Sequence, residues 1–353
     1  ELTSHRTVAS LPFGGRYRQI DFILSNMVNS NITRIGLITK YNYQSLMDHL
    51  GSCQEWDLNR KNGGLFILPP FASGNTGIYR GKLEALHVAI RFLENSNEEY
   101  VLMSDSMTLC NIDFRPVLES HMKSGCDVTA VANRDPETDI HNNLVMHANR
   151  SNRVTDIALQ YPSDEKSWQG MGMFIMSRKQ LLEVVLETTA RGMYHFERDF
   201  LQRYFNDGKI KVNIYPFDGI SLRNTNIPAY FKNNFRLCDP AVRKSLFRPE
   251  APIYTKVRDE IPTYYGNDAH ISDCIVADGC RLNGNVRDSV LFRDVSVQNG
   301  SHISNSIIMQ SANIGENVRL EYVILDKQVH ITDGTTLIGS PQNPVIISKG
   351  DEV

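Results

Sequence analysis

The stretch NVRDSVLFRDVSVQNGSHISNSIIMQSANIGENVRLEYVILDKQVHITDGTTL (residues 285–337) carries a regular aliphatic repeat. Its aliphatic residues recur at steps of 5, 6 and 6, so the pattern returns every 17 residues. A β-sandwich would favour a period of two. The repeat instead predicts a three-sided parallel β-helix of about three coils, with one inward aliphatic side chain per side and turn-forming residues at the corners. The inward positions are Val286, Leu291, Val297, Ile303, Ile308, Ile314, Leu320, Leu325, Ile331 and Leu337.

The segment before the repeat marks a change of domain. Cys274 and Cys280 continue the spacing backwards, and we expect both in the core of the β-helix. The stretch FRPEAPIYTKVRDEIPTYYG (247–266) has three prolines and little periodicity, which is typical of a connecting segment. The predicted division is a first domain at 1–245, a linker at 246–266 and a β-helix at 267–353.

The first domain alternates apolar runs with helical patterns. A helical pattern such as LEALHVAIRFLE (83–94) separates runs that are short and rich in β-branched residues. This alternation predicts an α/β, Rossmann-like domain with a mostly parallel sheet covered on both faces, and ligands bound at the carboxyl ends of its strands. The runs are TRIGLITK (33–40), YVLMSD (100–105), CDVTAVAN (126–133) and IKVNIYPF (210–217).

Composition excludes several classes of protein. The 353 residues give room for two domains, and 41% hydrophobic with 22% charged residues is ordinary for a globular chain. A net charge of -3 offers no basic excess for nucleic acid, and no apolar run is long enough for a membrane helix. The six cysteines are scattered and are expected as reduced thiols, so we expect a cytoplasmic protein.

Motifs along the chain carry a family resemblance. LTSHR (2–6), PFGGRYRQIDFILSNMVNS (12–30), HLGSCQEWDLNR (49–60), YRGKLEAL (79–86) and QGMGMFIMS (169–177) follow one another in a fixed order. Together with the β-helix they resemble glucose-1-phosphate adenylyltransferase, the ADP-glucose pyrophosphorylase of glycogen and starch synthesis. The resemblance implies a nucleotidyltransferase domain followed by a left-handed β-helix of the hexapeptide type. It also implies the reaction of ATP with glucose 1-phosphate to give ADP-glucose and pyrophosphate.

Several positions depart from that family's catalytic pattern. Asp105 stands where the family places a Mg²⁺ ligand, but Asn224 replaces the second metal carboxylate. Val8 replaces a lysine of the phosphate site, and the family's glycine-rich loop would precede Glu1. The resemblance therefore implies a Mg²⁺ site that depends on Asp105 alone, if the chain is catalytic.

The sugar pocket is altered as well. Tyr79 matches the family tyrosine, whereas Lys82, Leu83 and Glu84 replace a Thr-Ala-Asp triplet. Arg198 replaces a lysine, and Asp199 matches, so Tyr79, Arg198 and Asp199 are the substrate-contact candidates. Further replacements in the same pocket are Gln160, Tyr161 and Gly170.

These replacements favour a regulatory rather than a catalytic role for the chain. The chain resembles the GlgD-type subunit, which is implied to activate a catalytic glucose-1-phosphate adenylyltransferase within a hetero-oligomer, such as a tetramer; a homo-oligomer is the other possibility. Arg16 and Arg18 stand where the family's basic residues serve effectors, and guanidinium groups suit phosphorylated ligands. The alternative is a competent enzyme, with Lys82 or Arg198 as a replacement cation. A remote alternative is a hexapeptide acyltransferase that uses His302 or His330 as a base.

Overall fold

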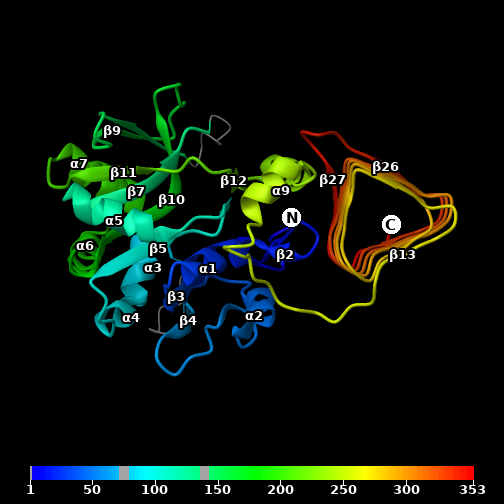
Figure 1. The fold of residues 1–353 in the computed structure, drawn as a ribbon, viewed down its shortest axis with the longest axis horizontal. Coiled ribbons are helices and arrows are strands. Elements are labelled where there is room, and N and C mark those ends of the chain that lie inside the picture. The colour runs from blue at the N-terminus through cyan, green and yellow to red at the C-terminus, as the bar shows by residue number, and fades with distance from the viewer. Residues whose placement is uncertain (1, 71–78, 136–142) are drawn as a thin grey trace.

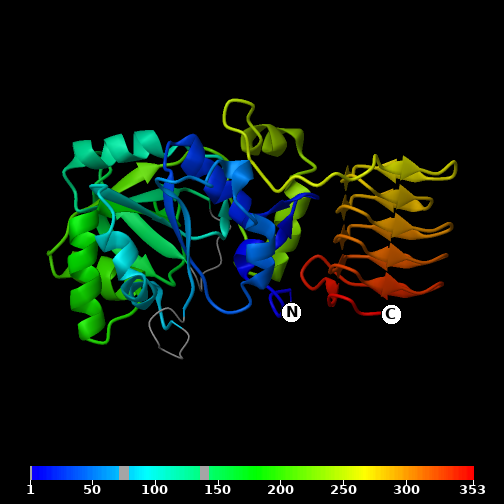
Figure 2. The same ribbon diagram turned by 90° about the horizontal axis from the view of Figure 1, so that it is seen from below.

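The computed structural model describes residues 2–70, 79–135 and 143–353, which form two domains. Figure 1 shows an α/β domain beside a triangular β-helix seen end on, and Figure 2 shows the coils of that β-helix stacked from the side. The predicted fold class, an α/β domain followed by a parallel β-helix, is confirmed.

The first domain contains helices and strands in alternation. Its helices are α1 (Gln19–Asn29), α2 (Gln44–Leu50), α3 (Lys82–Val88), α4 (Ile90–Glu94), α5 (Phe114–Ser124), α6 (Arg178–Ala190), α7 (Arg203–Asn206), α8 (Ile227–Arg236) and α9 (Pro240–Leu246), with two short 3₁₀ turns, η1 (Val8–Ser10) and η2 (Gln54–Trp56), and a π-helix, η4 (Phe196–Gln202). Its strands are β1 (Pro12–Phe13), β2 (Tyr17–Arg18), β3 (Arg34–Ile38), β4 (Gly64–Leu68), β5 (Tyr100–Ser104), β6 (Thr108–Leu109), β7 (Val128–Asn133), β8 (Leu144–Ala148), β9 (Val154–Leu159), β10 (Trp168–Ser177), β11 (Val212–Pro216) and β12 (Leu222–Arg223).

The main sheet of this domain is mixed. Its order is β11-β7-β10-β8-β9, with β5 also paired to β10. Strand β10 runs antiparallel to β5, β7 and β8, and only β7 and β11 pair in parallel. The prediction of a mostly parallel sheet was therefore wrong for this sheet. The error has a physical reason: β10 is buried along nearly its whole length, and a strand covered on both faces is apolar throughout whichever way it runs.

The four apolar runs are strands, as predicted. They correspond to β3, β5, β7 and β11. The helical pattern at 83–94 forms two short helices, α3 and α4, which are separated at Ala89. Helix α5 begins after Asp113, whose side chain accepts a hydrogen bond from the Arg115 N–H and caps the helix.

The β-helix consists of three parallel sheets with five strands each. It therefore has five coils rather than about three. The first coil was missed because two of its three strands are offset from the next coil by 15 residues (for example Ile271 to Val286), whereas the following step on that side is 17 (Val286 to Ile303). The strands are β13 (Tyr264–Tyr265), β14 (His270–Ser272), β15 (Ile275–Val276), β16 (Arg281–Leu282), β17 (Asn285–Arg287), β18 (Val290–Leu291), β19 (Ser296–Val297), β20 (His302–Ser304), β21 (Ile307–Ile308), β22 (Asn313–Ile314), β23 (Arg319–Glu321), β24 (Val323–Leu325), β25 (His330–Ile331), β26 (Thr336–Ile338) and β27 (Val345–Ile347).

The predicted inward positions form the core of the β-helix. All are buried except Leu337, which is partly buried against the same cluster. Cys280 is buried and Cys274 is partly buried, and both pack in this core as expected. The 17-residue repeat thus arises because inward side chains of successive coils stack along the axis of the β-helix.

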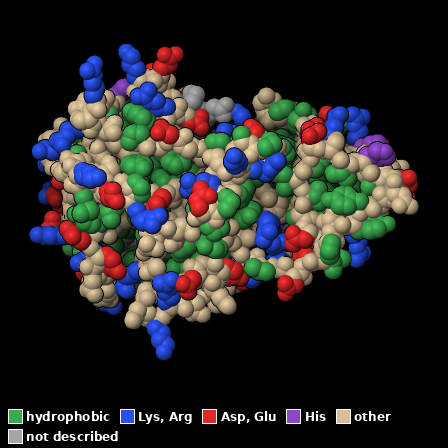
Figure 3. Space-filling view, viewed as in Figure 1, with side chains coloured by type: hydrophobic (Ala, Val, Ile, Leu, Met, Phe, Trp, Pro, Cys, Tyr) green, Lys and Arg blue, Asp and Glu red, His purple; other side chains and the backbone are tan. Residues whose placement is uncertain are grey.

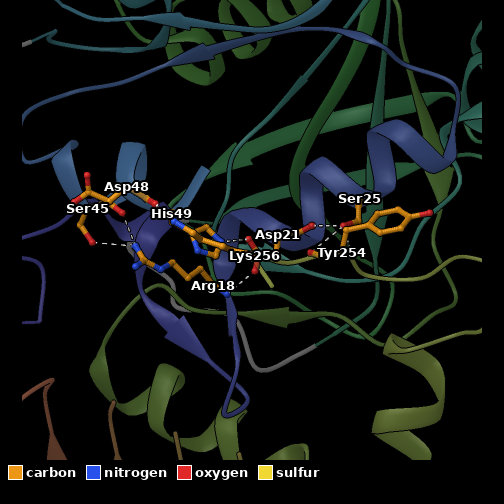
Figure 4. Close-up of polar contacts among 8 residues, drawn as sticks. All are labelled: Arg18, Asp21, Ser25, Ser45, Asp48, His49, Tyr254 and Lys256. Atoms are coloured by element: carbon orange, nitrogen blue, oxygen red, sulfur yellow. Dashed lines mark hydrogen bonds and ion pairs between the residues drawn. The ribbon is translucent and has the colours of Figure 1, made fainter. Parts of the chain in front are cut away.

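The connecting segment is anchored to the first domain. Between α9 and β13 the chain forms no helix or regular strand, yet Ile253 and Thr255 are buried. The Tyr254 N–H donates to Ser25 Oγ of α1 at 2.9 Å, a contact drawn in Figure 4. Strand β13 lies within the range predicted as linker and already pairs with β16, so the β-helix begins before the predicted boundary at 267.

The two domains share a continuous interface. Arg6, near the start of the chain, contacts the carboxylate of Asp326 in the β-helix at 2.7 and 2.8 Å, and both side chains are almost fully buried. An apolar cluster joins Phe13 and Leu237 of the first domain to Ile324 of the β-helix. Among the described residues, no helix is both long and apolar enough to cross a membrane.

Candidate functional site

Asp105 lies directly after β5, at the carboxyl end of the strand. Its N–H donates to the Gly172 carbonyl at 3.3 Å, and its Oδ1 accepts from the Met107 N–H at 3.1 Å. The register of β10 shifts between Gly170 and Phe174, and Gly172 there has a φ of +74°. A Cβ on Gly172 would lie 2.1 Å from Asp105 Oδ2, so glycine is needed for the carboxylate to occupy this position.

Asn224 is placed next to the same turn. Strands β6 and β12 pair, and the Asn224 N–H donates to the Met107 carbonyl at 2.9 Å. The side chain is buried; its Oδ1 accepts from Asn233 Nδ2 at 2.8 Å, and its Nδ2 has no partner among the described residues. The structure thus brings Asp105 and Asn224 together, but the amide oxygen of Asn224 is already engaged.

Lys82, at the start of α3, supplies a positive charge to this pocket. Its ammonium forms an ion pair with Glu197 and lies over the ring of Phe174 at 5.8 Å from the centroid. Burial alone would lower the pKa of Lys82, but the carboxylates of Glu197 and Asp105 outweigh it and raise that pKa. The charge of Asp105 is therefore partly balanced by the protein itself.

The fit of this pocket to Mg²⁺ is poor. Mg²⁺ prefers oxygen ligands in an octahedron and is commonly held by one or two carboxylates. Here Asp105 already accepts a backbone hydrogen bond, the Asn224 oxygen is engaged, and the Lys82 ammonium would repel a cation. No group of three or more His, Cys, Asp or Glu side chains that could hold a metal occurs among the described residues.

The three substrate-contact candidates lie in different environments. Tyr79 is buried, and its hydroxyl has no partner among the described residues. Arg198 is exposed and donates to Asp199 at 2.7 Å, while Asp199 Oδ2 accepts from the N–H groups of Tyr194 and His195 at 2.9 Å. Burial alone would raise the pKa of Asp199, but these hydrogen bonds lower it to about 2. Arg198 and Asp199 thus neutralise each other and hold the start of η4.

Val8 occupies an apolar environment. It begins η1 and packs against the interface cluster that contains Phe13 and Leu237. An aliphatic side chain suits this cluster, whereas a lysine ammonium there would lose hydration.

Arg16 and Arg18 lie in a second, strongly cationic pocket at the junction of the two domains. Arg16 is exposed, whereas Arg18 is buried and donates to the Ser45 carbonyl at 2.6 Å and Ser45 Oγ at 2.9 Å. Figure 4 shows Arg18 reaching toward α2, with Lys256 close by. The pocket has a volume of about 40 Å³, which suits a single anionic group, and its cations are Arg16, Arg18, Lys256, Arg258, Arg293 and Lys327.

The positive charges of this junction pocket are only partly balanced by neighbouring carboxylates. Burial and the neighbouring charges of Arg18 and Arg6 lower the pKa of Lys327 to about 7. Burial likewise lowers the pKa of Arg18 to about 10. Arg293 contacts Asp278 at 3.2 Å, yet burial still lowers its pKa. Depressed pKa values of cations signal a site in which an added negative charge would be stabilised.

Four of these cations were not predicted from the sequence. Lys256 and Arg258 come from the connecting segment, and Arg293 and Lys327 come from separate coils of the β-helix. They share no motif with Arg16 and Arg18, so no local pattern could have assigned them to one site.

Near this pocket, His49 contacts Asp21 Oδ1 at 2.5 Å. Burial of the imidazole outweighs this contact and lowers the pKa of His49, so the ring is neutral at pH 7. It adds no charge to the pocket.

His302 and His330 are not brought together. Both are exposed, and they lie on β20 and β25, which belong to different sheets of the β-helix. Asn285 contacts the His302 ring at 3.3 Å. Neither imidazole lines the junction pocket or the larger cavity between β10, α8 and the β-helix.

Comparison with known proteins agrees with this architecture. A nucleotidyl transferase family model matches residues 1–218, and a model for the GlmU-like C-terminal hexapeptide matches residues 261–343. The chain is 34% identical to the glycogen biosynthesis protein GlgD of Bacillus subtilis (strain 168) over 350 residues, which cover 99% of this chain and 92% of that protein. The chain belongs to the nucleotidyl transferase family.

Other members of the family are also similar along most of the chain. GlgD of Geobacillus stearothermophilus is 35% identical over 303 residues, or 85% of this chain and 77% of that protein. The glucose-1-phosphate adenylyltransferase of Bacillus mycoides (strain KBAB4) is 30% identical over 340 residues, or 95% of this chain and 90% of that protein. The resemblance to GlgD and the glucose-1-phosphate adenylyltransferases is confirmed.

Proposed function

We propose that this chain is a regulatory, weakly catalytic or non-catalytic subunit that activates a glucose-1-phosphate adenylyltransferase in cytoplasmic glycogen biosynthesis. The observation that carries the proposal is the state of the nucleotidyl pocket. The charge of Asp105 helps to raise the pKa of Lys82, whose ammonium pairs with Glu197, and Asn224 replaces the second metal carboxylate with an engaged amide. Transfer of the adenylyl group from ATP to glucose 1-phosphate, with release of pyrophosphate, requires neutralised phosphates and a positioned metal, and this pocket supplies neither well.

The contrast with the junction pocket supports a regulatory role. Six cations converge where the two domains meet, and Lys327 has a pKa near 7 because its charge is poorly compensated. We assign phosphorylated sugars to this pocket as effectors, since guanidinium groups bind phosphate oxygens with paired hydrogen bonds. A ligand held by both domains would favour one arrangement of the subunit and, through it, the active state of a partner.

A hetero-oligomer, such as a tetramer, is part of this proposal. Hydrophobic side chains are exposed on the face of the β-helix that Figure 3 shows. The exposed apolar residues near the first coil are Val257, Ile261, Tyr264 and Tyr265. Apolar side chains gathered on a surface mark sites of protein association.

A reconstitution assay tests the proposal. The purified chain would be assayed for ATP- and glucose 1-phosphate-dependent pyrophosphate release, alone and with a catalytic glucose-1-phosphate adenylyltransferase. We expect little turnover alone and increased turnover by the mixture. Arg18→Ala should reduce stimulation by phosphorylated sugars, whereas Lys123→Ala, an exposed cation on α5, should not. Strong turnover by the chain alone would overturn the proposal.

A competent enzyme is the second candidate, because Asp105 keeps its place at the end of β5. That candidate requires Asp105→Asn to abolish turnover by the chain itself. Stimulation of a partner that survives Asp105→Asn would instead support the regulatory role.

A further inference from the structure

Lys327 brings an unpaired amine to the junction pocket. It lies in the turn between β24 and β25, and its side chain is half-buried in the lining of the pocket. Its backbone is fixed, because its N–H donates to Asp326 Oδ1 at 2.6 Å and its carbonyl accepts from the Gly350 N–H at 3.0 Å. Within residues 2–70, 79–135 and 143–353, its Nζ has no hydrogen-bond or ion-pair partner. The amine is therefore held in place and open to a further group.

The charges around this amine are mostly positive. The cations that line the pocket or act on Lys327 are Arg6, Arg16, Arg18, Lys256, Arg258 and Arg293. The Asp326 carboxylate attracts Lys327, but Arg6 already holds that carboxylate at 2.7 and 2.8 Å. The other titratable groups in the lining carry no charge at pH 7: the pKa of His49 is lowered by burial, and the pKa of Tyr17 is raised by burial. In the described part of the chain, the lining of this pocket includes no carboxylate.

This environment makes Lys327 a nucleophile. Burial, followed by the charges of Arg18 and Arg6, lowers the pKa of Lys327 to about 7, so about half of the molecules carry a neutral amine there at pH 7. An ordinary lysine, with a pKa of about 10.4, has a neutral fraction roughly a thousandfold smaller at that pH. A neutral amine has a lone pair to share, whereas an ammonium has none. The pocket thus places a reactive amine where a negative charge would be stabilised.

We propose that Lys327 binds CO₂ as a carbamate, whose negative charge is held by the guanidinium groups of the junction pocket. The Nζ lone pair forms a bond to the carbon of CO₂, the electron pair of one C=O bond moves onto oxygen, and the proton lost from nitrogen passes to water. The pocket of about 40 Å³ has room for the added carboxylate group. Guanidinium groups such as those of Arg18 and Arg258 bind carboxylates with paired, charge-assisted hydrogen bonds.

The charge of the product favours CO₂ over other electrophiles. Acylation of Lys327 would give a neutral amide, and an aldehyde would give an imine, so neither product supplies a negative charge. A carbamate replaces a cation of the pocket with an anion, which is the charge that the remaining cations lack. The inference is independent of the activating role proposed above, because the carbamate forms on the chain alone and requires no sugar phosphate.

Chemical trapping tests the inference. The full chain would be equilibrated with ¹³C-labelled CO₂, treated with triethyloxonium, which esterifies carbamates, and digested for peptide mass spectrometry. We expect the ester on Lys327 and none on Lys123, an exposed lysine of α5. At constant dissolved CO₂, the occupancy of Lys327 should rise severalfold between about pH 6 and pH 8, since only the neutral amine reacts. The α-amino group at the chain terminus, with an ordinary pKa of about 8, reports whether trapping has worked.

Matched variants separate the carbamate from an anion that merely binds in the pocket. Arg258→Gln removes an exposed cation of the pocket and should lower the occupancy of Lys327 severalfold, whereas Arg60→Gln, at an exposed cation outside the pocket, should leave it unchanged. Lys327→Arg keeps the charge but cannot form the carbamate, and melting temperatures would show that the variants fold. The inference is overturned if the α-amino group is esterified and Lys327 is not. It is also overturned if a ¹³C resonance of bound bicarbonate persists in Lys327→Arg while no ester forms on Lys327 of the unchanged chain.

Discussion

The buried ion pair between Arg6 and Asp326 should hold the N-terminal segment against the β-helix. Arg6 is 2% exposed and Asp326 is 4% exposed at the side chain, and Arg6 Nη2 lies 2.7 Å from the carboxylate. Arg6→Met removes the guanidinium and leaves the Asp326 carboxylate buried without its main counter-charge. Breaking one partner of a buried pair costs roughly 3–5 kcal/mol, so we expect a loss of that size in the free energy of unfolding.

Urea unfolding followed by far-UV circular dichroism measures this loss, with the free energy extrapolated linearly to water. The matched control is Arg60→Met, which removes an exposed pair with Asp57 whose side chains are 41% and 78% exposed. Exposed pairs contribute about 0–1 kcal/mol, so this control should change stability little.

A second variant separates charge burial from packing. Arg6→Met combined with Asp326→Asn leaves no buried charge and should recover part of the loss seen in Arg6→Met alone. Equal stabilities for Arg6→Met and Arg60→Met would refute the reasoning. The reasoning would also be refuted if the double variant lost more stability than the losses of Arg6→Met and Asp326→Asn added together.

Four further predictions concern the charge of Lys327, the space beside Gly172 and the core of the β-helix. Because the pKa of Lys327 is about 7, sulfate binding measured by calorimetry should weaken severalfold between about pH 6 and pH 8, and Lys327→Met should remove this pH dependence. The same lowered pKa should make the folded chain gain stability as pH rises above about 7, since the unfolded lysine still binds its proton there. Gly172→Ala should lower the melting temperature more than Gly208→Ala: both glycines have positive φ, but only at Gly172 would the Cβ meet the Asp105 carboxylate, at 2.1 Å. Ile308→Ala should reduce the free energy of urea unfolding by about 2–5 kcal/mol, because Ile308 is fully buried in the β-helix.

The β-helix could be predicted because its periodicity is dictated by one requirement. Each side of each coil must place an apolar side chain on the axis, and Ile303, Ile308 and Ile314 meet this within a single coil. The first coil was not predicted because two of its strands are offset from the next coil by 15 residues rather than 17. Strand direction could not be read at all, because burial on both faces makes β10 apolar without fixing its orientation.

The sites were predictable only where motifs shared with the family mark their residues. Asp105 and Asn224 were expected in one pocket, and the pairing of β6 with β12 places them there. The ion pair of Lys82 with Glu197 was not expected, since no motif links these two positions. The cations contributed by the connecting segment and by the β-helix depend on how the two domains pack, which no sequence motif records.

The two pockets differ in how their charges are balanced, and this difference is the physical argument for the proposed regulatory role. In the nucleotidyl pocket, Lys82 pairs with Glu197 and Arg198 with Asp199, so its charges are satisfied without a ligand. In the junction pocket, burial and repulsion depress the pKa of Lys327, which means that the folded state holds its charge at a disadvantage. An anion bound there would relieve that disadvantage, and the free energy released would favour whichever arrangement of the two domains closes the pocket most tightly. Under the proposed role, such a subunit would respond to an anion through its conformation and would need no turnover of its own.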